Sequence, residues 1–329
     1  MCIRDSCLGG GLVGLFVTRR LVDSGFEVHL FDIVERETNA QFHLGSALEC
    51  DHSSADLIIN MLPGHLGNKA TESLKNTGQR IVDLSFSEIT PDNLQDVESS
   101  ILWDVGIAPG LSNMLVSMAS REYGHLDSVS IKVGGNPSEP DEEWSYMAPF
   151  SPHDVIAEYT RDARIIENGK LVEVAAMTEL HSIDANGRKM EAFLTDGLRS
   201  LLNIPAVKMG EYTVRWPGHI QKYQQSNLGP DELVDAWKLD PERGEFTWME
   251  VHIIAGDNER KWIVEDTGRD GDSSMARTTG LVTACCAIAW TENPEMLAPG
   301  VHAPEDLPNS VIESIIEIMR SEGVSIELR

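Results

Sequence analysis

The sequence is poor in cysteine and in positive charge, and each shortage excludes a class of protein. Its 329 residues include five cysteines, and no two of them have C-x-x-C spacing. This excludes a disulfide framework or a zinc site of the usual spacing, and it suits the reducing cytoplasm. Lysine and arginine total 26 against 53 aspartates and glutamates, which gives a formal net charge of −27. So acidic a surface argues against nucleic acid and anionic membranes as partners.

Long apolar runs and low-complexity tracts are also missing. No uninterrupted apolar stretch approaches the roughly 18 residues that a spanning helix needs, so we expect no membrane segment. Hydrophobic residues make up 41% of the chain, which is ordinary for a globular protein, and the length suits two domains. We therefore expect a cytoplasmic protein whose ligand is a small molecule.

The most informative stretch is rich in glycine. Gly9, Gly11 and Gly14 form a G-x-G-x-x-G motif, which an apolar helical pattern follows. After a turn at residues 23–25 comes a short apolar strand that ends in Asp32. Loop, helix, strand and acid in this order are typical of a dinucleotide-binding unit.

Each glycine of this motif has its own physical role. Gly9 permits a tight turn, Gly11 lets the backbone approach a pyrophosphate, and Gly14 lets the helix pack closely on the strand. The helix N-terminus then offers free N–H groups to the phosphates. Leu12 and Val13 begin this helix, so we expect them beside the cofactor as well.

Asp32 bears on the choice between NAD and NADP. It follows Gly14 by 18 residues, close to the spacing of roughly 20 expected for the acid that binds the ribose hydroxyls. Its carboxylate would repel a 2′-phosphate, which favours NAD. Arg36 lies four residues later and softens this preference, so NADP remains possible. We predict that Asp32→Arg weakens NAD binding.

The strand expected before the motif has an unusual composition. A central strand of a parallel sheet should be apolar, yet Arg4, Asp5 and Ser6 are polar, and an unpaired charge is costly to bury. Our hypothesis is that the first six or so residues are not the native start of the chain. Sequencing the source transcript through its first codon tests this, and a genuine Met1 start would contradict it.

The pattern of elements changes once along the chain. Strands alternate with helices over residues 8–110, which predicts a Rossmann-type doubly wound parallel sheet. Beyond Pro109-Gly110 a period-two alternation, clearest in a hairpin over 246–265, predicts a second α+β domain on a mixed or antiparallel sheet. Helices are predicted over residues 66–75, 91–98, 111–123, 274–290 and 310–320. Strands are predicted over 28–32, 57–62, 80–85, 101–105, 129–135, 212–216 and 324–328.

We expect three segments in this organisation. Residues 1–110 form the NAD(P)-binding domain, residues 111–272 bind substrate and dimerise, and residues 273–329 are C-terminal helices that pack back on the first domain. Ligands of a parallel sheet bind at the carboxyl ends of its strands. Leu62, Pro63 and Ser85 stand at two such ends, so we expect them to border the cofactor.

Several stretches resemble the saccharopine dehydrogenase family, and within it the lysine 6-dehydrogenase type. They fall in order over nearly the whole chain: DVGIAPGLSN at 104–113, VGGNP at 133–137, PFSP at 149–152, EY at 158–159, NGK at 168–170, EAFLTDG at 191–197, TVRWPGH at 213–219, SMARTTG at 274–280 and GVHAPE at 300–305. The chain departs from the family in its polar first strand, and it is shorter than the full saccharopine reductases.

The resemblance implies NAD(P)-dependent oxidation at a C–N bond of a lysine-derived amino acid. The alternative within the family is a saccharopine dehydrogenase or reductase that forms glutamate. The resemblance also implies a homodimer or higher homo-oligomer through the sheet of the second domain.

Such a reaction needs a cation for the substrate carboxylate and a group that transfers protons. Arg215 is the one cation in an apolar alternating strand and can fork onto a carboxylate, although a rim salt bridge would also explain it. His219 is the candidate for proton transfer, and Lys222 shares its predicted helix face. A histidine with all its hydrogen bonds made inside the protein is the alternative for His219.

Three further residues complete the candidate site. Asp104 ends a predicted sheet strand, where it can hold a substrate ammonium or orient water, or else cap the turn that follows. Tyr146 and Arg161 can line the same cleft.

Two other function classes follow from the same residues. A non-catalytic NAD-binding regulator would keep the fold without turnover, and NADH titration followed by an assay with lysine separates it from an enzyme. A Rossmann methyltransferase is disfavoured, because the break at Pro109-Gly110 leads into a β-rich second domain.

Overall fold

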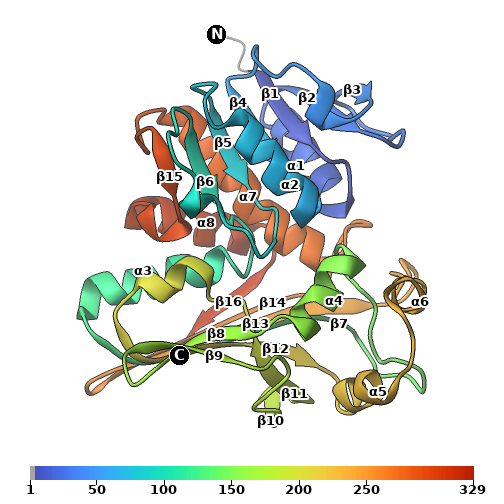
Figure 1. Ribbon diagram of the computed structural model, residues 1–329, viewed down its shortest axis with the longest axis vertical. Coiled ribbons are helices and arrows are strands. Elements are labelled where there is room, and N and C mark those ends of the chain that lie inside the picture. Colours follow the sequence, from blue (N-terminus) through green and yellow to red (C-terminus); the bar gives the residue numbers. More distant parts are fainter. Residues whose placement is uncertain (1–3) are drawn as a thin grey trace. The chain divides into compact units, whose positions relative to one another are not determined.

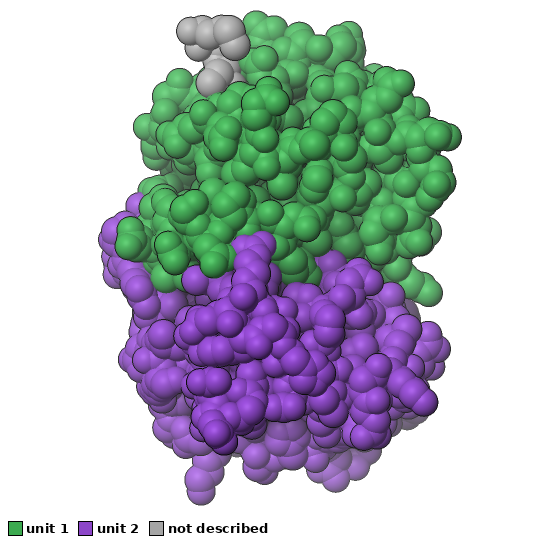
Figure 2. All heavy atoms as spheres, turned by 90° about the vertical axis from the view of Figure 1, so that its left-hand side faces the viewer, with its two compact units in different colours: residues 1–111, 279–318 green, residues 112–278, 319–329 purple. Residues whose placement is uncertain are grey.

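The computed structural model describes residues 4–329, and the chain divides into two compact units. Unit 1 comprises the chain up to Leu111 together with residues 279–318, and unit 2 comprises residues 112–278 and 319–329 (Figure 2). The segment expected over residues 273–329 is therefore divided between the two units.

Unit 1 is built on a parallel sheet with the order β15-β6-β5-β4-β1-β2-β3 (Figure 1). The strand order reverses at β1, which pairs with β2 on one side and β4 on the other, as in a doubly wound sheet. The predicted fold class is confirmed. The strands are β1 (Arg4–Leu8), β2 (Glu27–Asp32), β3 (Gln41–Leu44), β4 (Leu57–Asn60), β5 (Arg80–Asp83), β6 (Ser100–Trp103) and β15 (Gly300–His302).

The helices of unit 1 pack on this sheet and on one another. A Cβ added to Gly280 in α7 would lie 2.4 Å from the Phe16 ring of α1, so glycine lets these two helices approach closely. The helices are α1 (Leu12–Asp23), α2 (Gly64–Leu74), α7 (Ser274–Glu292) and α8 (Asn309–Ser321), with short 3-10 turns η1 (Ala47–Glu49), η2 (Pro91–Asn93) and η4 (Pro304–Asp306). The first residues of α7 (274–278) and the last of α8 (319–321) belong to unit 2.

The helix predicted over residues 91–98 is wrong. Only η2 forms there, and the backbone then extends at Leu94 and takes a positive φ of 55° at Asp96. Leu94 and Val97 still pack against the core of unit 1, but they do so from an irregular segment. Two apolar side chains bury too little surface to stabilise a helix by packing, so this segment does not form one.

Asp5 lies in the central strand β1 despite its charge. Its side chain is 0% exposed, and neither carboxylate oxygen has a hydrogen-bond partner in the part of the chain that the structure describes. Burial raises the pKa of Asp5 to about 7, against the opposing influence of Arg80. The polar residues Arg4, Asp5 and Ser6 are part of β1 because β2 and β4 form hydrogen bonds with their backbone. The buried Asp5 carboxyl group lowers the stability of the folded state.

We expect Asp5→Val to stabilise the protein most at high pH. The unfolded carboxyl ionises near 3.8, whereas the folded one keeps its proton up to about 7. The free energy of unfolding therefore falls as the pH rises from about 4 to about 7, by a total of roughly 4 kcal/mol. Denaturant unfolding at pH 4 to 8 measures this, with Asp5→Asn as an uncharged polar control. Parallel stability curves for wild type and both variants would contradict it.

Unit 2 is built on a mixed sheet with the order β10-β11-β12-β7-β13-β14-β16, to which β8 and β9 attach through β12. β7 runs parallel to β12 and antiparallel to β13, so the predicted mixed sheet is confirmed. The strands are β7 (Leu126–Pro137), β8 (Ala163–Glu167), β9 (Lys170–Val174), β10 (His181–Ala185), β11 (Arg188–Thr195), β12 (Ala206–Arg215), β13 (Glu245–Ala255), β14 (Asn258–Asp266) and β16 (Ser325–Leu328). The helices are α3 (Leu111–Tyr123), α4 (Pro152–Thr160), α5 (His219–Gln225) and α6 (Pro230–Ala236), with the 3-10 turn η3 (Arg199–Asn203).

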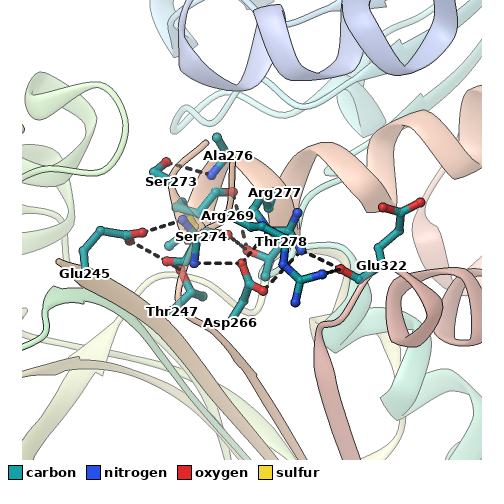
Figure 3. Close-up of polar contacts among 12 residues, drawn as sticks. Glu245, Thr247, Asp266, Arg269, Ser273, Ser274, Ala276, Arg277, Thr278 and Glu322 are labelled. Carbon is teal, nitrogen blue, oxygen red and sulfur yellow. Dashed lines mark hydrogen bonds and ion pairs between the residues drawn. The ribbon is translucent and has the colours of Figure 1, made fainter. Parts of the chain in front are cut away.

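A buried polar network ties the first turn of α7 to the β13–β14 hairpin (Figure 3). Glu245 accepts a hydrogen bond from the backbone N–H of Ser274 at 2.5 Å. Arg277 Nε donates to Asp266 Oδ2 at 2.9 Å, and its Nη2 donates to the Glu322 carbonyl at 2.8 Å. Because the Arg277 charge is buried with a partner, this network fixes where α7 begins rather than forming an open site.

Candidate functional site

The loop between β1 and α1 has the geometry that the glycine motif predicts. Gly9 has a φ of +97°, and a Cβ on it would lie 2.8 Å from the Met61 carbonyl oxygen. A Cβ on Gly14 would lie 2.0 Å from the Gly9 carbonyl oxygen, so only glycine fits there. At Gly11, by contrast, no heavy atom of the described chain lies within 4 Å of the Cβ position. The backbone is therefore open to a ligand at Gly11.

The N-terminus of α1 carries no internal anion. Its N-cap is Gly11, which has no side chain with which to cap the helix. The first turn of α1 contains no acidic residue. Leu12 is exposed and Val13 is half-buried in this turn. The free N–H groups and the positive end of the helix dipole thus remain for an anionic ligand.

Asp32, at the end of β2, reaches back to the same loop. Its Oδ2 accepts a hydrogen bond from the Gly10 N–H at 2.6 Å, and its Oδ1 accepts one from the Val34 N–H at 2.8 Å. Arg36 Nε lies 3.4 Å from Oδ2. The carboxylate is therefore held beside the glycine loop, where the ribose of a dinucleotide would meet it.

The other predicted cofactor residues follow β4 and β5. Leu62 packs against the core of unit 1, and Pro63 is the N-cap of α2. Ser85 is buried against Gly67 of α2, and its N–H donates to Asp83 Oδ1 at 2.7 Å. Ser85 therefore helps to join β5 to α2.

Asp104 lies just beyond β6 in unit 1. It is buried and takes a φ of +58°, a conformation that residues other than glycine seldom adopt. Burial raises the pKa of the nearby Asp83 to about 6, and the charge of Asp104 adds to this. The carboxyl ends of β5 and β6 thus hold two neighbouring carboxyl groups.

In unit 2 the structure brings Arg215 and Tyr146 together and adds Tyr159. Arg215 is the last residue of β12, and its side chain is 3% exposed. Its Nε donates to the Tyr159 hydroxyl at 2.8 Å, its Nη1 donates to the Val214 carbonyl at 2.9 Å, and its Nη2 donates to the Tyr146 hydroxyl at 3.4 Å. The guanidinium carbon also lies 4.4 Å from the centre of the Tyr146 ring. The buried charge is stabilised by these groups and by Glu158, 3.6 Å away.

His219 joins the same cluster as a neutral side chain. Its Nδ1 lies 2.9 Å from the Trp144 carbonyl, which can only accept, so Nδ1 carries the proton. Its Nε2 then accepts from the Tyr159 hydroxyl at 3.1 Å. Burial, together with the nearby Arg215 charge, lowers the pKa of His219 to about 3. His219 is therefore placed as a fixed acceptor, not as a base with a pKa near neutrality.

Glu158 is the titratable residue that the sequence analysis did not single out. It lies on α4 next to Tyr159, and its side chain is 16% exposed. Burial raises its pKa to about 7, against the opposing influence of Arg215 and Arg161. The Glu-Tyr pair at 158–159 is part of the family resemblance, but nothing in the sequence links it to Arg215, 57 residues further along.

Arg161 and Lys222 lie at the margin of this cluster. Arg161 pairs with Asp196 at 3.0 Å, and Arg164 pairs with the same carboxylate at 2.8 Å. Lys222 is exposed, donates to the Glu143 carbonyl and lies 5.3 Å from the centre of the Trp144 ring. Of the predicted substrate residues, Arg215 and Tyr146 are therefore in direct contact, while Arg161 and Lys222 have other partners.

Over residues 4–329 no group of three or more His, Cys, Asp or Glu side chains is arranged to hold a metal ion. No helix in the same range is both long and apolar enough to span a bilayer.

Tyr159→Phe is expected to destabilise unit 2 by about 2 to 4 kcal/mol, because it leaves Arg215 Nε and His219 Nε2 buried without partners. Tyr223→Phe is the matched control. The Tyr223 ring packs on Tyr159 at 5.0 Å, but its hydroxyl makes no hydrogen bond with any residue that the structure describes. Chemical denaturation measures both, and an equal loss in the two variants would contradict the role assigned to the Tyr159 hydroxyl.

A parallel Rossmann-type unit and a mixed-sheet unit with a buried Arg–Tyr–His cluster define a two-unit α/β protein. Residues 106–228 match the family model of the saccharopine dehydrogenase C-terminal domain. This match, which includes Arg215 and His219, confirms the resemblance to the saccharopine dehydrogenase family.

One solved structure shows the same fold over nearly the whole chain. The apo saccharopine dehydrogenase (L-Glu forming) of Saccharomyces cerevisiae is similar with a TM-score of 0.73 and 14% identity, over 99% of both chains. Two weaker likenesses are GenD2 from gentamicin A biosynthesis in complex with NAD (TM-score 0.46, 12% identity, 99% of this chain and 96% of that one) and the C. glutamicum DAP dehydrogenase in complex with DAP (0.47, 10%, 96% and 98%).

Proposed function

We propose that this protein is an NAD(P)-dependent oxidoreductase that acts on a C–N bond of a lysine-derived amino acid, as a lysine 6-dehydrogenase does. The observation that carries the proposal is the open backbone at Gly11 beside an uncapped helix N-terminus, with Asp32 held at the same loop. The family match over residues 106–228 supports the substrate class. The alternative is oxidation of saccharopine to form glutamate, or the reverse reaction, which is the activity named for the similar yeast structure.

The residues of unit 1 fit a dinucleotide. Gly9 and Gly14 give the loop its tight shape. The N–H groups at Gly11 and Leu12 would bind the diphosphate, and the Asp32 carboxylate would accept hydrogen bonds from the ribose hydroxyls. When bound, NAD(P)⁺ supplies an acceptor for the hydride that leaves the carbon bearing the nitrogen.

The cluster in unit 2 suits an amino-acid substrate. The hydrogen bonds of Arg215 are made internally, so it acts on a substrate carboxylate through its positive field rather than as a free fork. The Tyr146 hydroxyl accepts from Arg215, and its own proton meets no acceptor within residues 4–329, so it can donate to that carboxylate. Glu158, at the exposed margin of the cluster, takes the proton of the substrate ammonium in this proposal.

The cytoplasmic location and the homodimer remain predictions. The chain's acidic surface and its mixed sheet support them, and sedimentation of the purified protein tests the oligomeric state.

A substrate screen tests the reaction class. We expect reduction of NAD⁺ with lysine or a closely related amine, read by absorbance, with saccharopine and both cofactors tested in parallel. Asp32→Arg is expected to weaken NAD⁺ binding about tenfold or more, because it replaces the acceptor of the ribose hydroxyls with a cation. Unchanged NAD⁺ affinity in this variant would remove Asp32 from the site, and binding without turnover on any amine would favour the regulator.

The pH dependence separates Glu158 from His219 as the proton acceptor. With the Glu158 pKa raised to about 7, the group is deprotonated above that pH, so kcat/KM rises as the pH increases through about 7. Glu158→Gln is expected to remove this limb and to lower kcat about 100-fold. His219→Asn is expected to keep the limb, because the pKa of His219 is lowered to about 3. A limb near 7 that survives in Glu158→Gln would contradict the assignment.

A further inference from the structure

Arg36 and Asp32 together cover one residue of the glycine loop. A Cβ added to Gly10 would lie 2.9 Å from Arg36 Cγ and 3.0 Å from Asp32 Oδ2. The aliphatic stem of Arg36 therefore lies on the loop itself, and its side chain remains 33% exposed. A partly exposed guanidinium is thus anchored four residues after the end of β2, next to the carboxylate that would meet the ribose.

Asp32 and Arg36 differ in how many of their hydrogen-bonding atoms have partners. Both oxygens of Asp32 are engaged, Oδ2 by Gly10 N–H and Arg36 Nε and Oδ1 by Val34 N–H. Arg36 uses only its Nε in this contact. Neither Nη atom has an acceptor within hydrogen-bond distance among residues 4–329. Arg36 therefore presents two unused, permanently charged N–H₂ groups beside the ribose position.

We propose that Arg36 is a specificity-determining residue that binds the 2′-phosphate of NADP(H), so that the site accepts both dinucleotides. This inference rests on the proposed function. Guanidinium groups pair with phosphate oxygens through two parallel hydrogen bonds, and the two Nη groups are the donors available for this. With NAD(H), the 2′-hydroxyl would donate to Asp32 instead, and Arg36 would keep its contact with Asp32.

The surrounding charges set the order of the two affinities. Asp32, with the exposed Glu35 and Glu37 next to Arg36, gives the segment three negative charges against one positive charge. A 2′-phosphate dianion is repelled by these carboxylates while it pairs with Arg36. NAD(H) therefore binds more tightly than NADP(H), and added salt narrows this difference because it screens the net repulsion of the 2′-phosphate.

Binding measurements without turnover test this. NADH and NADPH are titrated by fluorescence into wild type, Arg36→Ala and Arg36→Lys, and each is then displaced with 5′-ADP or with 2′,5′-ADP. We expect Arg36→Ala to lose about 10- to 100-fold in affinity for NADPH and 2′,5′-ADP, and to stay within about twofold for NADH and 5′-ADP. Arg36→Lys keeps part of the affinity, as a point charge without the fork.

Arg19→Ala, at an exposed arginine of α1, is the matched control for the loss of one positive charge. Equal NADPH affinity in wild type and Arg36→Ala, or an equal loss for NADH and NADPH, would overturn the inference and leave the proposed function standing. No detectable NADPH binding by a wild type that binds NADH would also overturn it. A wild type that binds neither dinucleotide would overturn the proposed function itself.

Discussion

The glycine loop of unit 1 depends on the contact between Gly14 and the carbonyl oxygen of Gly9. No side chain fits between them, so the first turn of α1 lies directly on the residue that leaves β1. The N–H of Gly9 donates to the Phe31 carbonyl at 2.9 Å, which brings the end of β2 beside the loop. Asp32 then reaches Gly10, and Arg36 lies over the same residue. One close backbone approach therefore positions the N-terminus of α1, Asp32 and Arg36 relative to one another.

Unit 2 solves a different problem, which is how to bury a permanent positive charge. Arg215 is surrounded by two phenol groups, a carbonyl and one carboxylate, so its charge is compensated mostly by neutral oxygens and ring faces. The Trp144 carbonyl fixes the proton of His219 on Nδ1, and the direction of the Tyr159 hydrogen bond follows from that. Burial, together with the same positive charge, keeps the histidine neutral. Glu158 is the least buried group of the cluster, and burial raises its pKa to about 7.

The site residues that lie close together in the sequence were predictable from it. Those that meet only through tertiary packing were not. The glycine motif and Asp32 act within one βαβ segment, and Arg215 and His219 stand four residues apart at the end of one strand. Glu158 and Tyr159 meet Arg215 only through tertiary packing of α4 beside β12. β9 escaped prediction because its residues are almost all exposed and carry no alternating pattern. The helix over 91–98 was predicted from local composition, and too few apolar residues were present to hold it.

The carboxyl in β1 has a thermodynamic consequence for the whole chain. Between about pH 4 and pH 7 the unfolded Asp5 is ionised while the folded one is protonated, so folding takes up close to one proton from solution. The heat of unfolding measured by calorimetry therefore includes the ionisation enthalpy of the buffer, and it differs between phosphate and an amine buffer at the same pH.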